Sequence, residues 1–232
     1  MSIEWITGNI FTTKAQTIVN TVNCVGVMGA GIALECRLRY PDLFGDYVLI
    51  CKENRLRPGK LWMYKASDRW ILNFPTKDDW KAPSREEYLH LGLRKFLDTY
   101  QPRGIDSIAF PLLGADRGGL SADSSKRVME EYLSKANIPV EIYSYDPSAR
   151  DDLYDEFRRW LMAGGDSLLV EAYKVRKDIV KKLVNAVAQD TTTQLNQLGR
   201  IKGVGIRSLE KVFQAARSEM DSPQQMGLDL SD

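Results

Sequence analysis

The chain has 232 residues, 44% of them hydrophobic and 27% charged, with a formal net charge of +1; these values are typical of a soluble protein with one sizeable domain and a small one. No stretch of about 18 apolar residues is present, which excludes a transmembrane helix, and the N-terminus lacks the basic and apolar regions of a secretory signal. We therefore expect a cytoplasmic protein without a membrane partner.

The first third of the chain alternates strand-like and helix-like segments. Runs rich in Ile, Val and Thr predict strands at residues 3–10 and 17–23. Residues 29–53 predict one or two helices, the second beginning near Pro41. Two further strands are predicted at 60–66 and 70–76.

The alternation continues to residue 162. A helix is predicted over 84–100, with Ser84 and Glu87 at the spacing of a capping box. The continuous apolar run at 104–114 predicts a central parallel strand. A helix, a strand and a closing helix follow at 124–136, 138–146 and 151–162. Strands that alternate with helices predict an α/β sandwich with a mostly parallel sheet, in a domain of residues 1–162.

The segment 163–166, "AGGD", predicts a break before a small all-helical domain of residues 163–218. Helices are expected at 167–189, 191–198 and 206–220, and a disordered tail at 219–232. Residues 164–217 contain ten Lys and Arg against five Asp and Glu, whereas residues 1–163 contain 22 of each. This excess of positive charge fits either a polyanionic partner or a solvated basic helix.

The cysteine and histidine content of the chain disfavours several kinds of catalytic and metal site. Cys24, Cys36 and Cys51 form no C-x-x-C pair, which favours a reducing compartment over a disulfide framework or a zinc site. His90 is the only histidine, so Ser-His-Asp catalysis and multi-histidine metal sites are disfavoured. We expect no metal and no cofactor.

Two glycine-rich loops follow predicted strands and precede predicted helices, at residues 23–33 and 111–120. Glycines in such loops let backbone N–H groups approach an anion, and the N-terminus of a helix adds partial positive charge. Neither loop has the spacing of a P-loop or of a dinucleotide-binding fingerprint. Together they predict a site for a diphosphate held between them.

A third loop, "FPTKDDW" at residues 74–80, leaves a strand and presents Lys77 beside two aspartates. Such a lysine is usually a solvated surface residue. A deprotonated lysine amine is, however, a good nucleophile toward an aldehyde-like carbon, and this loop is predicted at the same edge of the sheet as the glycine-rich loops.

Five segments in this order, "TGNI", "VNTVNCVGVMGAGIAL", "FPTK", "PLLGADRGGL" and "YSYD", resemble the landmarks of a macrodomain over about residues 1–160. The branch that is most similar contains DarG-type DNA ADP-ribosyl glycohydrolases and the terminal ADP-ribose glycohydrolase of animals. The resemblance implies a three-layer α/β/α macrodomain with a mostly parallel mixed sheet. It also implies ADP-ribose as ligand and product, ADP-ribosylated DNA as substrate, and a DNA ADP-ribosyltransferase toxin as a candidate partner.

By the same resemblance the catalytic lysine is Lys77. The aspartate that the animal enzyme pairs with its lysine falls on Gly118 when no gap is allowed, so whether Asp116 takes this second catalytic role is open. Asn9 stands where macrodomains usually have an aspartate near the adenine, and Asp116 replaces a glycine of the second loop. The resemblance assigns ligand binding to Asn9, Ile10, Asn23, Gly29, Ala30, Gly31, Ile32, Thr76, Leu113, Gly114, Ala115, Arg117, Gly118, Gly119 and Tyr145.

The resemblance implies a reaction at the anomeric carbon of an ADP-ribosyl group. Lys77 attacks C1″, or first stabilises the opened sugar, and water then releases ADP-ribose from the lysyl adduct. Asp116, Asp78 and Asp79 are the candidates for general acid or base. We expect Asp78 and Asp79 to point away from the amine.

Residues 195–216 resemble a helix-hairpin-helix motif, with "IKGVG" as the hairpin. In that family backbone N–H groups of the hairpin hold a DNA phosphate without reading sequence. The DNA-binding residues implied are Lys202, Gly203, Gly205, Arg207 and Lys211. A plain pair of helices with a glycine turn is the alternative.

Three functions stay open at this point. The leading hypothesis is an enzyme that removes ADP-ribose from a DNA base. The second is a hydrolase of ADP-ribosyl-glutamate esters in proteins. The third is a non-catalytic ADP-ribose reader, which the departures at Asn9 and Asp116 motivate.

Overall fold

A computed structural model describes residues 3–189 and 192–220, and the chain forms two compact units, Met1–Ala149 and Arg150–Asp232. The boundary between the units therefore lies before residue 150, whereas the sequence predicted it after residue 162. The reason is that α5 (Tyr154–Trp160) belongs to the second unit. Phe157 of α5 is fully buried, and Arg158 Nε donates to the carbonyl oxygen of Val187, 2.8 Å away.

The first unit is built on one six-stranded sheet with the strand order β1-β6-β5-β2-β4-β3. All neighbours pair in parallel except β3 and β4, which are antiparallel. The strands are β1 (Ile3–Gly8), β2 (Thr17–Val22), β3 (Trp62–Lys65), β4 (Trp70–Pro75), β5 (Ile108–Pro111) and β6 (Val140–Tyr145). The predicted mostly parallel mixed sheet is confirmed.

The register places the C-terminal ends of the parallel strands side by side. Gly8 at the end of β1 is level with Tyr145 at the end of β6, and Val22 at the end of β2 is level with Pro75 at the end of β4. The loops that follow β1, β2, β4, β5 and β6 therefore leave from one edge of the sheet, where open α/β folds bind ligands.

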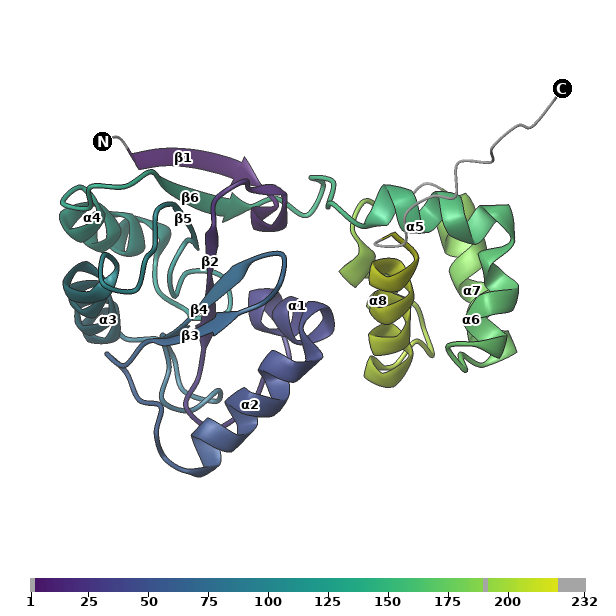
Figure 1. Ribbon diagram of the computed structural model, residues 1–232, viewed down its shortest axis with the longest axis horizontal. Helices are drawn as coiled ribbons and strands as arrows, with labels where there is room; N and C mark the ends of the chain where they lie inside the picture. The colour runs from purple at the N-terminus through teal and green to yellow at the C-terminus, as the bar shows by residue number, and fades with distance from the viewer. Residues whose placement is uncertain (1–2, 190–191, 221–232) are drawn as a thin grey trace, which may run out of the picture. The chain divides into compact units, whose positions relative to one another are not determined.

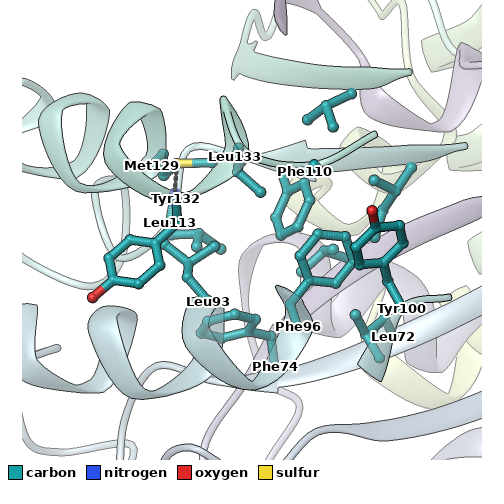
Figure 2. Close-up of a cluster of buried hydrophobic side chains, with 14 of the residues drawn as sticks. Leu72, Phe74, Leu93, Phe96, Tyr100, Phe110, Leu113, Met129, Tyr132 and Leu133 are labelled. Atoms are coloured by element: carbon teal, nitrogen blue, oxygen red, sulfur yellow. Dashed lines mark hydrogen bonds between the residues drawn. The ribbon is translucent and has the colours of Figure 1, made fainter. Parts of the chain in front are cut away.

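Helices cover both faces of this sheet (Figure 1). On one face lie α1 (Gly31–Arg39) and α2 (Pro41–Lys52), which share a core with the sheet around Ile18, Leu43 and Tyr47. On the other lie α3 (Glu86–Thr99) and α4 (Ala122–Leu133), whose larger core is shown in Figure 2. The three-layer α/β/α architecture expected from the resemblance is confirmed.

Local sequence signals account for several helix boundaries. Pro41 stands in the first turn of α2, where its missing N–H costs nothing. Ser121 caps α4, since its side chain accepts from the backbone N–H of Ser124 at 3.1 Å. The capping box predicted at Ser84 is wrong: α3 is preceded by Arg85 and has no side-chain cap. Ser84 instead donates its backbone N–H to the carbonyl oxygen of Gly118, 2.8 Å away.

The second unit is all-helical among its described residues. It contains α5, a π-helical turn η2 (Leu161–Gly165), α6 (Asp166–Glu171), α7 (Lys177–Ala188), a 3₁₀ helix η3 (Leu195–Arg200) and α8 (Ile206–Met220). The predicted break at 163–166 is a turn at Gly164, whose φ of 108° suits glycine. The single helix predicted at 167–189 is two helices, α6 and α7, with Lys174 between them at a φ of 56°.

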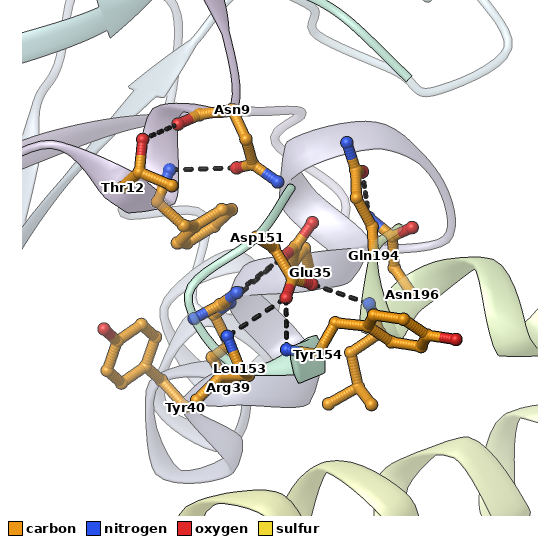
Figure 3. A network of polar contacts seen from close by, with 12 residues as sticks. Asn9, Thr12, Glu35, Arg39, Tyr40, Asp151, Leu153, Tyr154, Gln194 and Asn196 are labelled. Carbon is orange, nitrogen blue, oxygen red and sulfur yellow. Dashed lines mark hydrogen bonds and ion pairs between the residues drawn. The ribbon is translucent and has the colours of Figure 1, made fainter. Parts of the chain in front are cut away.

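Asp151 connects two elements of this helical unit (Figure 3). One carboxylate oxygen accepts from the backbone N–H groups of Leu153 and Tyr154, at 3.0 and 2.5 Å, at the start of α5. The other accepts from the N–H of Leu195 at 2.6 Å, where η3 begins. A single buried carboxylate thus satisfies donors at two helix N-termini.

The predicted tail at 219–232 falls largely outside the described residues, which end within it at the last residue of α8, Met220. No helix in the described part of the chain is long and apolar enough to cross a membrane.

Candidate functional site

The loop that carries Lys77 is hydrogen-bonded to the loop that follows β2. The backbone N–H of Thr76 donates to the carbonyl oxygen of Val22 at 3.0 Å, and the N–H of Cys24 donates to that of Asp78 at 2.9 Å. Cys24 Sγ lies 3.4 Å from the carbonyl oxygen of Lys77. These bonds continue the parallel pairing of β2 and β4 beyond the strands, so the backbone of Lys77 has a defined position.

The half-buried side chain of Lys77 reaches the second glycine-rich loop. Its Nζ donates to the carbonyl oxygen of Arg117 at 2.8 Å. Within residues 3–189 and 192–220 the amine forms no ion pair, and Asp79 accepts from the backbone N–H of Lys81 at 2.9 Å instead. The amine therefore lies at the junction of two loops, with its position set by a neutral carbonyl group.

The second glycine-rich loop is closed by its own backbone. Leu120 N–H donates to the carbonyl oxygen of Gly114 at 3.0 Å. Gly118 packs so tightly inside the loop that a Cβ atom there would lie 2.1 Å from that oxygen and 2.5 Å from Ser84 Oγ. Only glycine fits at position 118, and the loop holds Arg117, and through it Lys77, in place.

Ser84 is hydrogen-bonded to this loop. The residue is buried, its backbone N–H holds Gly118, and its hydroxyl has no hydrogen-bond partner among the described residues. The sequence did not identify Ser84 as part of the site, because its spacing to Glu87 suggested a helix cap. No local pattern could reveal its contact with a loop 34 positions away in the chain.

The first glycine-rich loop is organised by Asn23 and Tyr47. Asn23 Nδ2 donates to the carbonyl oxygen of Val27 at 2.6 Å, and its Oδ1 accepts from Val25 N–H at 3.1 Å. The Tyr47 hydroxyl donates toward both oxygens of Asn23, at 2.8 and 3.0 Å. Burial raises the pKa of Tyr47, so the phenol stays a donor. The Asn23 side chain, predicted to bind ligand, is thus engaged within the loop.

The two glycine-rich loops lie next to each other. A Cβ atom on Gly31 would lie 3.7 Å from the side chain of Arg117. Gly31 begins α1, and Ala30 before it provides no side-chain cap, so the first N–H groups of this helix are available to a ligand. Gly29, Ala30 and Gly119 are exposed beside them. Unused backbone donors from two adjoining loops suit a diphosphate.

Asn9 and Ile10 follow β1 at the far end of the same edge, where Gly8 of β1 is level with Tyr145 at the end of β6. Asn9 Oδ1 accepts from the backbone N–H of Phe11 at 3.0 Å and caps the short helix η1 (Ile10–Thr12). Its Nδ2 is buried without a partner among the described residues. Tyr145 is half exposed at the end of β6.

The candidate acids differ in their surroundings. Asp116 is exposed, and its nearest cation is its neighbour Arg117, with Nε 3.9 Å from Oδ2. Asp78 is exposed and Asp79 is half-buried. Cys24, next to Lys77, is no candidate nucleophile, because burial raises the pKa of its thiol to about 12.

Leu113 and Thr76 are placed inside the fold. Leu113 is fully buried, its N–H faces Met129 Sδ at 3.5 Å, and its carbonyl accepts from Ser125 Oγ at 2.7 Å. Thr76 is buried in the turn beside β2. Both support the loops from within, and their role in ligand binding stays a prediction. Ala115 and Ile32 are half-buried within the two loops.

In the second unit, residues 201–205 form the predicted turn between η3 and α8. Gly203 has a φ of 97°, and Val204 is buried beneath the turn. Lys202, Gly205 and Arg207 are exposed. The element before the turn is a 3₁₀ helix, where the motif predicted an ordinary helix. Lys211 Nζ donates to the carbonyl oxygen of Lys174 at 2.6 Å, so its amine is used within the unit.

Comparison with known proteins places these features in a family. A family model described as "Macro domain" matches residues 19–129. The structure is similar to the macrodomain of Mycobacterium tuberculosis DarG, with a TM-score of 0.58 and 35% identity over 61% of this chain and 97% of that one.

Two curated relatives carry informative names. A DNA ADP-ribosyl glycohydrolase of Thermus aquaticus is 38% identical over 149 residues, which are 62% of this chain and 41% of the relative. A DNA ADP-ribosyl transferase-DNA ADP-ribosyl glycohydrolase fusion protein of Thermosipho africanus is 34% identical over 161 residues, 61% of this chain and 42% of the relative. The chain therefore spans less than half the length of each of these two relatives.

Proposed function

This chain belongs to the macrodomain family, and on that premise we propose that it removes ADP-ribose from modified DNA, with Lys77 as the catalytic group. One observation carries the proposal: the Lys77 amine lies on the Arg117 carbonyl oxygen, at the junction of two glycine-rich loops with unused backbone donors. The relatives named DNA ADP-ribosyl glycohydrolases support DNA as the substrate.

Each part of ADP-ribose is assigned to residues at this edge of the sheet. The N–H groups at the start of α1 and in the loop around Gly118 hold the diphosphate, and Asn9 and Ile10 lie at the adenine end. This arrangement directs the distal ribose toward Lys77, because β4, which precedes Lys77, lies on the opposite side of β5 and β2 from β1 and β6. The two glycine-rich loops carry no net charge, because Asp116 and Arg117 balance each other. Recognition of the diphosphate therefore rests on backbone donors, whose orientation is set before the ligand arrives.

The reaction proceeds by substitution at C1″. The lone pair of the Lys77 amine forms a bond to C1″ while the bond from C1″ to the base nitrogen breaks, and the base leaves with a proton from an acid. The sugar ring then opens: the nitrogen loses a proton, the ring oxygen gains one, and an imine remains. Water adds to the imine carbon, and Lys77 departs as a free amine with release of ADP-ribose.

Asp116 is the acid we assign to this scheme. It directly precedes Arg117, whose carbonyl oxygen holds the amine, and its carboxylate is exposed toward solvent, from which it can be reprotonated. Asp79 is less suited, because the backbone N–H of Lys81 already occupies its carboxylate.

Kinetics of matched variants test the proposal. Lys77→Ala should slow the release of ADP-ribose from a modified oligonucleotide by roughly 10³-fold or more. Lys81→Ala removes an exposed lysine four residues away and should keep the normal rate. Calorimetry with free ADP-ribose checks that the Lys77→Ala pocket remains intact. A Lys77→Ala enzyme as fast as Lys81→Ala would refute the role of the lysine.

A parallel experiment tests whether the enzyme acts on modified DNA or on modified protein. The same enzyme preparation is given an oligonucleotide and a glutamate-modified protein that carry the same ADP-ribosyl group. We expect turnover of the oligonucleotide at least tenfold faster. Faster release from the protein would favour the ester hydrolase, and tight ADP-ribose binding without turnover of either would favour a reader.

A DNA ADP-ribosyltransferase is the protein partner we propose. The Thermosipho africanus relative carries a transferase and a glycohydrolase in one fusion protein, so the two activities occur together in a similar protein. Co-expression provides the test: the present chain should lower the ADP-ribose content of DNA in cells that express such a transferase, and the Lys77→Ala variant should not.

The helical unit is proposed to hold a phosphate of the same DNA at its hairpin. Lys202 and Arg207 flank the glycine turn and are exposed, whereas the Lys211 amine is bound to the Lys174 carbonyl. Lys202→Ala and Arg207→Ala should each reduce the salt dependence of DNA affinity by about one unit of slope. Lys211→Ala is the matched control and should change the slope less. An equal change in all three variants would count against the hairpin.

A further inference from the structure

A basic hollow lies on the macrodomain away from the glycine-rich loops. It has a volume of about 460 Å³ and lies between residues 57–60, which precede β3, and residues 91–98 of α3. Four of its lining residues are cations: Arg57, Lys60, Arg94 and Lys95. The only acid among the lining residues is Asp98, so the hollow carries a net charge of about +3.

None of these cations has a neutralising partner within residues 3–189 and 192–220. All four side chains are exposed, and within the described part of the chain none of them forms an ion pair or a side-chain hydrogen bond. Arg94 and Lys95 stand four and three residues before Asp98 on α3, a spacing that often yields helix-surface pairs, yet the carboxylate pairs with neither. Unpaired like charges gathered in one hollow repel one another, and an anionic ligand relieves this repulsion.

The wall of the hollow is preformed. Lys60 N–H donates to the carbonyl oxygen of Arg57 at 2.9 Å and closes a turn. Gly59 lies so close to α3 that a Cβ atom there would be 3.0 Å from Leu91 Cβ. Arg103 donates to the carbonyl oxygen of Leu61 at 3.2 Å and fixes the end of the segment. The cations therefore project from a braced segment and a helix.

The lining indicates which part of a polyanion would bind. It contains Leu91 and Pro58 but no aromatic residue, so bases have no ring to stack on. Positive charge with small apolar contacts suits the phosphates and sugars of a nucleic-acid backbone. We propose that this hollow binds the backbone of the DNA substrate several nucleotides from the modified base; the inference rests on the proposed function.

Helix α3 sets the distance from the reaction centre. The helix begins at Glu86, two residues after Ser84, which braces the loop that holds Lys77. Residues 94–98 lie roughly 12 to 18 Å further along the helix axis, at 1.5 Å per residue. Phosphates along one strand recur about every 3.4 Å of duplex axis. Counted from the start of α3, which adjoins the loop that holds Lys77, the hollow therefore lies roughly four or five nucleotides along a duplex strand.

Unmodified DNA tests the site independently of hydrolysis. Affinities of the full chain for duplex oligonucleotides are measured by fluorescence anisotropy over a range of salt concentrations. Lys60→Glu combined with Lys95→Glu should weaken binding at least tenfold at low salt and reduce the slope of log K against log salt by about 1.5 to 2. The control is Lys14→Glu combined with Lys135→Glu. It changes the net charge by the same amount, but at two exposed lysines elsewhere on the same unit.

Oligonucleotide length gives a second readout. The substrates carry two to eight nucleotides beyond the modified base. For the wild type and the control pair, we expect KM to fall once a substrate extends about four or five nucleotides beyond that base. The Lys60/Lys95 pair should lose this step while its turnover of an ADP-ribosylated mononucleoside stays normal.

The outcomes separate the two proposals. If the wild type hydrolyses nothing, the proposed function fails, and the anisotropy series still decides whether the hollow binds DNA. Equal weakening in the Lys60/Lys95 pair and the Lys14/Lys135 pair, or an unchanged affinity in both, would overturn the inference.

Discussion

Replacing Gly118 by alanine should disable the enzyme through the loop that holds Lys77. The added Cβ atom would lie 2.1 Å from the Gly114 carbonyl oxygen, and it must move by about 0.9 Å to reach even the 3.0 Å that such contacts tolerate. Overpacking of this kind costs about 1–3 kcal/mol of stability. Because Arg117 adjoins Gly118 and its carbonyl holds the Lys77 amine, the displacement reaches the reacting group. A misplacement of about 1 Å can lower the rate roughly 10²-fold.

The assay combines thermal unfolding with the initial rate of ADP-ribose release from a modified oligonucleotide, measured well below the melting temperature of every variant. Gly45→Ala is the control, since no atom lies within 4 Å of its added Cβ and alanine favours the interior of α2. We expect Gly45→Ala to be as active as the wild type and slightly more stable. A Gly118→Ala enzyme with normal rate and normal melting temperature would show that the loop around Gly118 does not hold Lys77 in place.

Three further predictions concern individual side chains. Asp151→Ala should destabilise the helical unit by about 2–4 kcal/mol in denaturant titrations, because backbone donors at two helix starts lose a charged acceptor; a change below 0.5 kcal/mol would contradict this role. At pH 8 the Cys24 thiol should react with a thiol reagent on the order of 10³ times more slowly than an unperturbed cysteine, since burial raises its pKa to about 12. Labelling as fast as that of an unperturbed cysteine would contradict the burial of this thiol. Hydrogen bonds from Ser124 and Arg127 lower the pKa of the Glu86 carboxyl below 4.5, so Ser124→Ala should lower the melting temperature at pH 7, and the difference should shrink as the pH falls below 4.5. A difference that grew toward acid pH would reverse the sign of this linkage.

Much of the macrodomain could be predicted from the sequence because the relevant signals are local. The apolar run before Pro111 predicted a central strand, and β5 pairs in parallel on both sides. Pro41 predicted the start of the second helix. Since parallel strands end at one edge, the sequence also predicted that three loops meet there, and the contact of Lys77 Nζ with Arg117 joins two of them.

The remaining features depend on contacts between distant segments. Ser84 looked like a helix cap because its spacing to Glu87 is right, but its backbone N–H binds Gly118. The last helix of the predicted first domain joins the second unit because Arg158 bonds to Val187. Asn23 carries a polar amide in a ligand loop, and only the fold shows that Tyr47 and the loop backbone already use it. Such partners are chosen by packing and leave no periodicity in the sequence.

The covalent role of Lys77 can be measured most directly by trapping. The enzyme is mixed with ADP-ribosylated DNA in the presence of a borohydride reductant, which converts an imine into a stable secondary amine, and the protein is analysed by intact mass and peptide mapping. We expect one ADP-ribosyl group per chain, attached at Lys77 and dependent on the modified DNA. Full release of ADP-ribose with no adduct, or an equal adduct in Lys77→Ala, would contradict it.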